Sequence, residues 1–197
     1  ALRSVEGAGE PDRDGCLTRR HYRTTGFPAS RAPIDARVPL LFNDDVTLFT
    51  MKPLASDPAY FSNGDGDELF FVRTGRGTVR SVFGDVPFSS GDYVAVPKGT
   101  LYRMVLESDD AELLLLECRS GLGIPRAFRN EVGQIRMDAP YSHRDFRRPA
   151  FSGPLEEGIR DVVVKRHGGY HGFRYPHSPL DVVGWDGAIY PWALPRS

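Results

Sequence analysis

The stretch from residue 63 to residue 83 constrains the fold more than any other part of this 197-residue chain. A turn of small and acidic residues leads into the apolar run 69–72, and a Gly-Arg-Gly turn at 75–77 leads into a second run, 78–83. Val, Phe and Thr are favoured in strands, and glycines of this kind mark the turns between strands. The stretch therefore predicts two consecutive strands that form a β-hairpin.

The spacing of the glycines extends this prediction to a whole barrel. Six residues separate Glu68 from Gly75, and fifteen separate Gly75 from Gly91. Five more lie between Gly91 and Pro97. This skeleton resembles the two sequence motifs of the cupins with their shortest usual spacer. The resemblance implies a mainly β protein, a cupin-type antiparallel β-barrel, or jelly roll.

Most cupins hold a metal with two His and one Glu from the first motif and one His from the second. Where the first two His would fall, this chain has Phe61, Ser62, Asn63 and Gly64, and the second motif has Tyr102. Metal sites of this kind need three or more protein ligands that converge on one point. We therefore expect a metal-free barrel.

Glu68 is the one residue left from that ligand set. A carboxylate that points into a barrel without a partner carries a desolvation cost of several kcal/mol. We therefore expect Glu68 to turn outward or to meet one of three nearby arginines, Arg73, Arg80 or Arg103.

The amino-acid composition further limits the fold class and the function. Glycine (21) and proline (16) make up 37 of the 197 residues, which leaves little room for long helices. The net charge of −1 gives no electrostatic reason for binding nucleic acid or an anionic membrane. We see neither a membrane span nor a secretory signal, and the two cysteines, Cys16 and Cys118, do not form a disulfide framework. We expect a soluble, cytoplasmic protein.

The patterns divide the chain into three parts. Residues 1–36 are interpreted as a leader and an irregular arm, and residues 37–120 as a degenerate cupin barrel. Residues 121–197 are interpreted as a loop, an additional hairpin at 162–175 and a crossover segment rich in proline and aromatic residues that packs on the barrel. Within the barrel, further strands are expected at 46–52, 103–107 and 112–118, the last with four consecutive leucines. We expect no terminating element in the tail from Pro176.

Six sequence blocks make the resemblance more specific. They are Leu40–Val46, Gly64–Val72, Phe83–Asp85, Gly91–Thr100, Tyr141–Arg147 and Ser178–Gly187. In their order and approximate spacing, these blocks resemble the homogentisate 1,2-dioxygenase family from about Leu40 to Trp192, and the block around Pro-Leu-Asp-Val-Val-Gly-Trp-Asp-Gly is the most diagnostic. The resemblance implies a ring-cleaving oxidoreductase of tyrosine and phenylalanine breakdown that uses non-haem Fe(II).

The same resemblance implies that the iron ligands of the family, two His and one Glu, lie in a second, C-terminal cupin. No catalytic, cofactor-binding or metal-binding residue is therefore carried over to this chain, and whether the chain alone is an enzyme stays open. The expected partners are the catalytic cupin half, further copies of the chain, or both. The alternative is a stand-alone metal-free cupin that acts as a binding or assembly module. A metal-free isomerase would need an acid–base pair inside the barrel, where only Tyr102 is placed.

Three histidines are weighed as a site of their own. His167, His171 and His177 lie on neighbouring predicted strands, and converging imidazoles would suit a divalent metal. The first two straddle a predicted turn, and no carboxylate lies beside them at ligand spacing. We interpret them as surface or interface residues. The sequence alone does not determine whether the three imidazoles converge.

Overall fold

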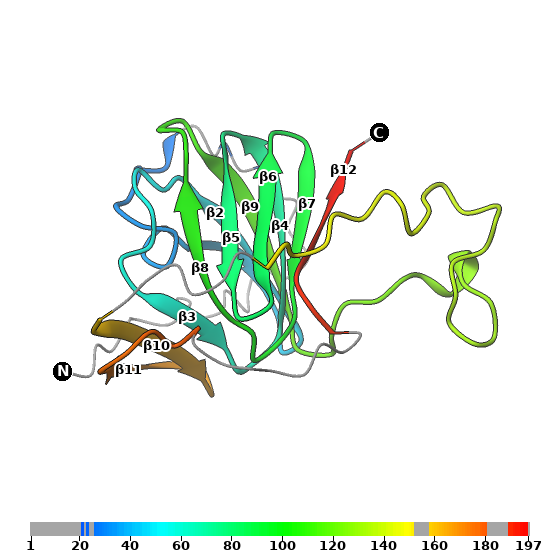
Figure 1. Ribbon diagram of the computed structural model, residues 1–197. Helices are drawn as coiled ribbons and strands as arrows, with labels where there is room; N and C mark the ends of the chain where they lie inside the picture. Colours follow the sequence, from blue (N-terminus) through cyan, green and yellow to red (C-terminus); the bar gives the residue numbers. More distant parts are fainter. Residues whose placement is uncertain (1–20, 22, 24–25, 152–157, 181–188, 197) are drawn as a thin grey trace.

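The computed structural model describes residues 21, 23, 26–151, 158–180 and 189–196, and strands dominate this part of the chain (Figure 1). The strands form two six-stranded sheets, in the orders β1-β2-β9-β4-β7-β12 and β11-β10-β3-β8-β5-β6. The first sheet contains β1 (Val38–Phe42), β2 (Val46–Met51), β9 (Glu112–Cys118), β4 (Asp67–Thr74), β7 (Asp92–Val96) and β12 (Trp192–Pro195). The second contains β11 (Gly169–Tyr175), β10 (Arg160–Arg166), β3 (Tyr60–Asn63), β8 (Leu101–Leu106), β5 (Arg76–Ser81) and β6 (Gly84–Ser89).

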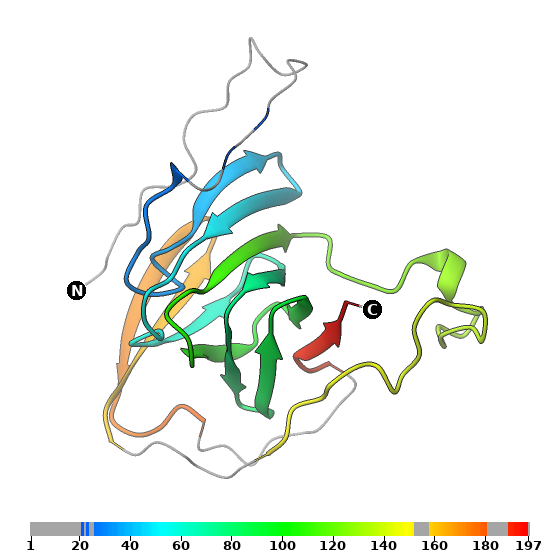
Figure 2. The same cartoon turned by 90° about the horizontal axis from the view of Figure 1, so that it is seen from above.

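One hydrophobic core lies between the two sheets, and Figure 2 shows the strands curving around it. Phe70 and Leu115 from the first sheet meet Val79 and Met104 from the second, and all four are fully or almost fully buried. The four-leucine run is a strand, as predicted, with burial alternating along β9. This double-sheet architecture confirms the predicted cupin-type jelly roll.

The predicted hairpin between β4 and β5 is wrong. The two strands are consecutive in sequence, but β4 pairs with β7 and β9, whereas β5 pairs with β6 and β8. The chain crosses from one sheet to the other at Gly75, which has a φ of 92°. A Cβ there would lie 2.8 Å from the Cα of Ala111, so both backbone angle and space favour glycine. A tight turn between strands therefore marks a corner of the barrel here.

The second half of the chain completes both sheets. The predicted hairpin at 162–175 is confirmed as β10 and β11, which turn through His167 and Gly168 at positive φ values of 51° and 72°. This hairpin extends the second sheet, but β10 runs parallel to β3, a departure from a purely antiparallel barrel. The expectation of a tail without a terminating element is wrong, because β12 pairs with β7.

Between the barrel and this hairpin, residues 121–150 form an excursion that projects from the barrel at the right of Figure 1. It contains a short 3₁₀ helix, Arg126–Phe128. The expected leader at 1–20 and most of the diagnostic block at 178–187 lie outside the described residues. Among the described residues, no helix is long and apolar enough to cross a membrane.

Candidate functional site

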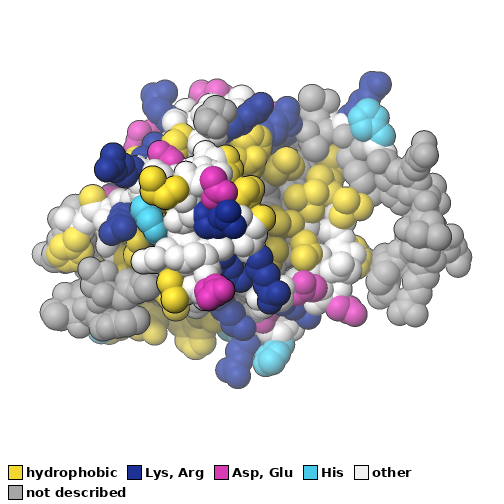
Figure 3. All heavy atoms as spheres, turned by 90° about the vertical axis from the view of Figure 1, so that its right-hand side faces the viewer, with side chains coloured by type: hydrophobic (Ala, Val, Ile, Leu, Met, Phe, Trp, Pro, Cys, Tyr) yellow, Lys and Arg dark blue, Asp and Glu magenta, His cyan; other side chains and the backbone are white. Residues whose placement is uncertain are grey.

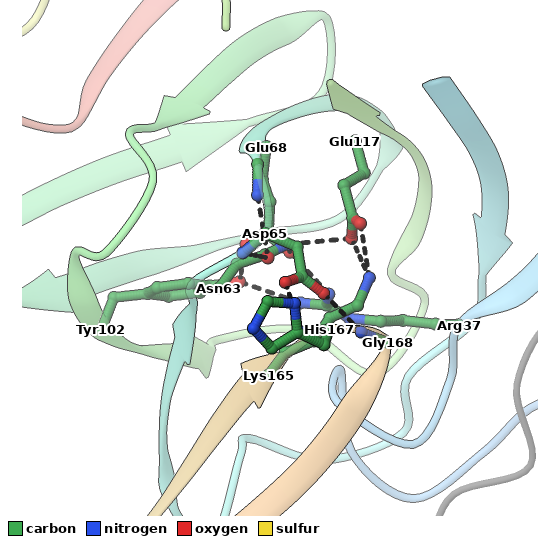
Figure 4. A network of polar contacts seen from close by, with 10 residues as sticks. Arg37, Asn63, Asp65, Glu68, Tyr102, Glu117, Lys165, His167 and Gly168 are labelled. Carbon is green, nitrogen blue, oxygen red and sulfur yellow. Dashed lines mark hydrogen bonds and ion pairs between the residues drawn. The ribbon is translucent and has the colours of Figure 1, made fainter. Parts of the chain in front are cut away.

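Six polar side chains come together inside the barrel, as Figure 4 shows in close-up. Glu68 on β4 lies directly opposite Glu117 on β9, and Asn63 on β3 lies opposite Lys165 on β10. Like charges at directly opposed positions of a sheet destabilise it unless they are compensated. The two remaining members are Arg37, just before β1, and Tyr102 on β8. We refer to these six residues as the interior cluster.

Glu68 is completely buried, and both of its oxygens are in use. Oε1 accepts hydrogen bonds from Arg37 Nη1 at 2.5 Å and from Asn63 Nδ2 at 3.1 Å. Oε2 accepts one from the Tyr102 hydroxyl at 2.6 Å. The expectation that Glu68 turns outward is wrong, and so are the proposed partners. Donors were required, as argued, but they are Arg37 just before β1, Asn63 on β3 and Tyr102 on β8.

The three arginines expected beside Glu68 are engaged elsewhere. Arg80 pairs with Asp85, Arg73 lies 3.3 Å from Glu112, and Arg103 Nε donates to the backbone oxygen of Asp57. In β4, β5 and β8, side chains alternate between the two faces of the sheet, and these three arginines lie on the face away from the barrel interior.

Arg37 supplies the positive charge at the centre of the cluster. Its guanidinium also donates to the Tyr102 hydroxyl at 3.0 Å and lies over the Phe61 ring, 4.4 Å from the centroid. Burial by itself would lower the pKa of the guanidinium, but the combined effect of Glu68, Tyr102 and Tyr170, with Glu68 the largest of the three, outweighs burial and raises the pKa above its ordinary value. Burial, and then the neighbouring Glu68 charge, raise the pKa of Tyr102 well above its ordinary value. The cluster therefore holds a charged arginine beside a neutral phenol.

Asn63 joins the two carboxylates. Its amide nitrogen donates to Glu68 and to Glu117, while its oxygen accepts from the backbone N–H groups of Asp65 and Gly66. These partners fix the orientation of the amide, because only its NH₂ group can face two carboxylates. The amide nitrogen, which is a hydrogen-bond donor and not a metal ligand, therefore faces both carboxylates.

Lys165 closes the cluster from the β10–β11 hairpin. Its ammonium group donates to both oxygens of Glu117, at 2.6 Å to Oε2. Two cations, Arg37 and Lys165, therefore balance two carboxylates, Glu68 and Glu117. Buried ion pairs of this kind persist when each charge is matched and hydrogen-bonded.

Asp65 holds the turn of the same hairpin. Its carboxylate accepts the backbone N–H groups of His167 at 2.6 Å and of Gly168 at 2.8 Å. Partial burial would raise the pKa of Asp65, but the hydrogen bonds from Gly168 and His167 lower it below its ordinary value. The loop that precedes β4 is thereby tied to the hairpin that carries Lys165.

The residues at the motif positions do not fit a ferrous ion. An apolar ring, an amide nitrogen and a phenol stand there, and a fixed guanidinium neutralises the surviving carboxylate. Iron sites of this class use imidazole and free carboxylate ligands. Within the described residues, no group of three or more His, Cys, Asp or Glu side chains could hold a metal. His167, His171 and His177 do not form such a group, and His177 instead packs against Tyr175.

Sequence reasoning missed three members of the cluster. Arg37 lies in an irregular segment where no periodicity indicates which way a side chain points. Lys165 follows three valines on β10, and Glu117 follows four leucines on β9. The period of two that they share with Val163 and Leu115 could have placed both on the inner face. All three side chains come from outside the two sequence motifs.

Comparisons with known proteins place the chain in a family. The model of the homogentisate 1,2-dioxygenase N-terminal region matches residues 45–194. The chain is 35% identical over 159 residues to a Saccharolobus solfataricus protein named "Putative dioxygenase", covering 80% of this chain and 41% of that one. It is 28% identical over 134 residues to the homogentisate 1,2-dioxygenase of Bradyrhizobium diazoefficiens, covering 68% and 29% of the two chains.

The Pseudomonas entomophila homogentisate 1,2-dioxygenase is 26% identical over 188 residues, 90% of this chain and 42% of that one. The chain thus spans less than half the length of these curated relatives. Among solved structures, a cupin-2 domain protein from Shewanella frigidimarina is similar with a TM-score of 0.37 and 18% identity, over 42% of this chain and 80% of that one. Because the family model covers most of the chain, this protein belongs to the homogentisate 1,2-dioxygenase family and corresponds to its N-terminal region.

Proposed function

We propose that this chain is the metal-free cupin barrel of a homogentisate 1,2-dioxygenase-type enzyme, and that it supports a catalytic cupin half without carrying out the ring cleavage itself. One observation carries the proposal. The Arg37 guanidinium is paired with Glu68 at the place where the motif resemblance puts a metal. A permanent positive charge there competes with any divalent cation for the same carboxylate.

The chemistry of the interior cluster supports a structural role. Both oxygens of Glu68 accept hydrogen bonds, and both the NH₂ group and the oxygen of the Asn63 amide are hydrogen-bonded. Neither side chain therefore offers a free proton acceptor or metal ligand. Activation of dioxygen at Fe(II) needs open coordination positions in a set of His and carboxylate ligands. In the proposed enzyme these come from the catalytic cupin half, and this barrel contributes a rigid partner surface.

The partner surface is proposed to include the outer face of β11. β11 is the edge strand of the second sheet, and its side chains Phe173 and Tyr175 are 52% and 41% exposed. Exposed aromatic residues beside an unpaired sheet edge favour association with another protein surface. The occupant is the catalytic half in the complete enzyme, or a second copy when the chain is alone.

The metal prediction is tested with the purified 197-residue chain. After anaerobic incubation with Fe(II) and desalting, elemental analysis should find no stoichiometric iron, and no ring opening of homogentisate should follow with ascorbate and oxygen. The same chain carrying a hexahistidine tag controls for iron detection, and an active family enzyme controls for the assay. About one iron per untagged chain, or turnover by it, would overturn the proposal.

The association prediction uses light scattering coupled to size exclusion. The unsubstituted chain should increase in mass with concentration, because Phe173 and Tyr175 on its β11 face are exposed. Phe173→Ser with Tyr175→Ser should shift the mass toward the monomer, whereas Leu54→Ser, which changes a side chain 57% exposed at another place, should not. A chain that stays monomeric at every concentration contradicts the proposed self-association.

A further inference from the structure

Within the interior cluster, a lysine and an asparagine are held side by side on two parallel strands. The pairing of β3 with β10 places Asn63 directly opposite Lys165. Neighbouring strands lie about 4.8 Å apart, and directly opposed side chains leave the sheet on the same face. A backbone hydrogen bond of 2.8 Å from the Gly64 N–H to the Lys165 oxygen fixes this register. The amine and the amide can therefore reach each other without any movement of the strands.

This pair and the carboxyl group between them are removed from water. Figure 3 shows lysine and arginine side chains spread over one face of the molecular surface, whereas Lys165 is only 8% exposed. Asn63 and Glu117 are 3% and 5% exposed. Keeping two charges in a dry interior is costly. Transfer of one proton from Lys165 Nζ to Glu117 along their hydrogen bond turns the ion pair into a carboxylic acid and a neutral amine, which is the nucleophilic form of lysine.

One oxygen of Glu117 contacts both nitrogens. Its Oε2 accepts hydrogen bonds from Lys165 Nζ at 2.6 Å and from Asn63 Nδ2 at 2.8 Å. A carboxyl group in this position can take a proton from the amine and give one to the amide nitrogen. The Asn63 oxygen accepts the backbone N–H groups of Asp65 at 2.9 Å and of Gly66 at 3.2 Å. Two such donors polarise the carbonyl group and stabilise negative charge that develops on its oxygen.

We propose that Lys165 and Asn63 form an isopeptide bond autocatalytically, with Glu117 as the proton relay. The neutral Nζ attacks Cγ of Asn63, a new Nζ–Cγ bond forms, and the Cγ–Nδ2 bond breaks. Glu117 moves one proton from Nζ to Nδ2, which leaves as ammonia. The proton that Glu117 first took from the ammonium group stays on its carboxyl group, so the cluster remains neutral, with Arg37 paired to Glu68. The product would tie β3 to β10 covalently. This activity goes beyond the proposed function and does not depend on it.

Intact mass spectrometry of the denatured, unsubstituted chain tests the proposal without any variant. The mass should be lower than that of the sequence by one molecule of ammonia. The chain has three lysines, Lys52, Lys98 and Lys165, so peptide mapping can assign the linked one. The digest should contain a branched peptide that joins the segments around Asn63 and Lys165. A chain with the full sequence mass would overturn the proposal. A mass increase from hydrolytic deamidation of Asn63 would overturn it as well, because the amide would then have reacted with water.

Two variants and a matched control assign the roles. Lys165→Arg keeps the positive charge but offers no nucleophilic amine, and Glu117→Gln keeps the size but cannot relay a proton. Both should keep the full mass of their sequences. Lys98→Arg, which changes an exposed lysine, should lose ammonia as the unsubstituted chain does. Loss of ammonia from Lys165→Arg, or equal loss from Glu117→Gln and the unsubstituted chain, would contradict the proposed roles. If circular dichroism shows that a variant does not fold, the mass and the branched peptide of the unsubstituted chain decide alone.

Discussion

Replacement of Arg37 by Met should lower the free energy of unfolding by about 3–5 kcal/mol, the usual cost of removing one partner from a buried ion pair. Methionine keeps an unbranched apolar side chain against Phe61, so the loss reports mainly on the charge. Glu68, fully buried, would keep only Asn63 and Tyr102 as donors. Urea unfolding followed by circular dichroism measures the change, and the midpoint of thermal unfolding should fall by roughly 10 °C.

A double-mutant cycle separates this charge effect from general damage. Glu68→Gln added to Arg37→Met should recover part of the loss, because it removes the uncompensated negative charge. Arg31→Met, which changes an exposed arginine in the arm six residues before Arg37, should cost less than about 0.5 kcal/mol. If the Arg37 and Arg31 variants have equal stability, the interior cluster does not depend on this guanidinium.

The interior cluster explains how the fold holds together distant parts of the chain. Two opposed carboxylates on neighbouring strands would repel each other, and their compensating cations come from before β1 and from β10. A barrel cut to the motif-bearing strands would leave Glu68 and Glu117 buried without their cations. In this chain the segment just before β1 and the C-terminal hairpin therefore both contribute side chains to the barrel interior.

The sequence predicted the fold class well because glycine spacing and strand alternation are local signals. The strands around Glu68 and Leu115 followed from them. Sheet partners did not follow, because the turn at Gly75 has the same composition as a hairpin turn while it carries the chain into the opposite sheet. The strand β12 was missed since its four residues end in a proline, which normally argues against a strand and is tolerated at an edge.

The candidate site was predictable only in part. The sequence identified Phe61, Asn63, Glu68 and Tyr102 as the residues at the motif positions, and these positions converge in the structure, although Glu68 was expected to turn outward or to meet other arginines. What replaces the metal could not be read from the motifs, because Arg37 reaches the cluster from a segment without periodicity. Tertiary contacts of an irregular arm are set by the packing of the whole barrel and leave no local pattern.

Asp57 gives the chain a second expected dependence, on pH. It is 1% exposed, and its carboxylate accepts the backbone N–H groups of Ile34 in the arm at 2.9 Å and of Met104 on β8 at 3.2 Å. Burial raises the pKa of Asp57 from 3.8 to about 7, against the opposing effects of these hydrogen bonds and of Arg37 and Arg103. The folded state therefore binds this proton more tightly than the unfolded state.

The sign of the stability change follows from that difference. A carboxyl group with a raised pKa in the folded state contributes stability when protonated, and the contribution is lost as pH rises from about 4 to about 7. A difference of about 3 pKa units corresponds to about 4 kcal/mol. The Asp57→Asn side chain cannot titrate. The difference in the free energy of unfolding, unsubstituted chain minus variant, should therefore fall by about 4 kcal/mol between about pH 4 and about pH 7 and stay level above pH 7.

Urea unfolding at several pH values between 4 and 8 measures this difference directly. Asparagine should also cost roughly 1–3 kcal/mol at every pH, because its NH₂ group cannot accept the second backbone N–H. Asp35→Asn, which changes an exposed carboxylate next to Ile34 in the arm, serves as the control and should show no comparable trend. If the free energy of unfolding depends on pH in the same way for the unsubstituted chain and the Asp57→Asn variant, Asp57 is ionised in the folded protein. In that case the attraction of Arg37 and Arg103 outweighs the effect of burial on its pKa.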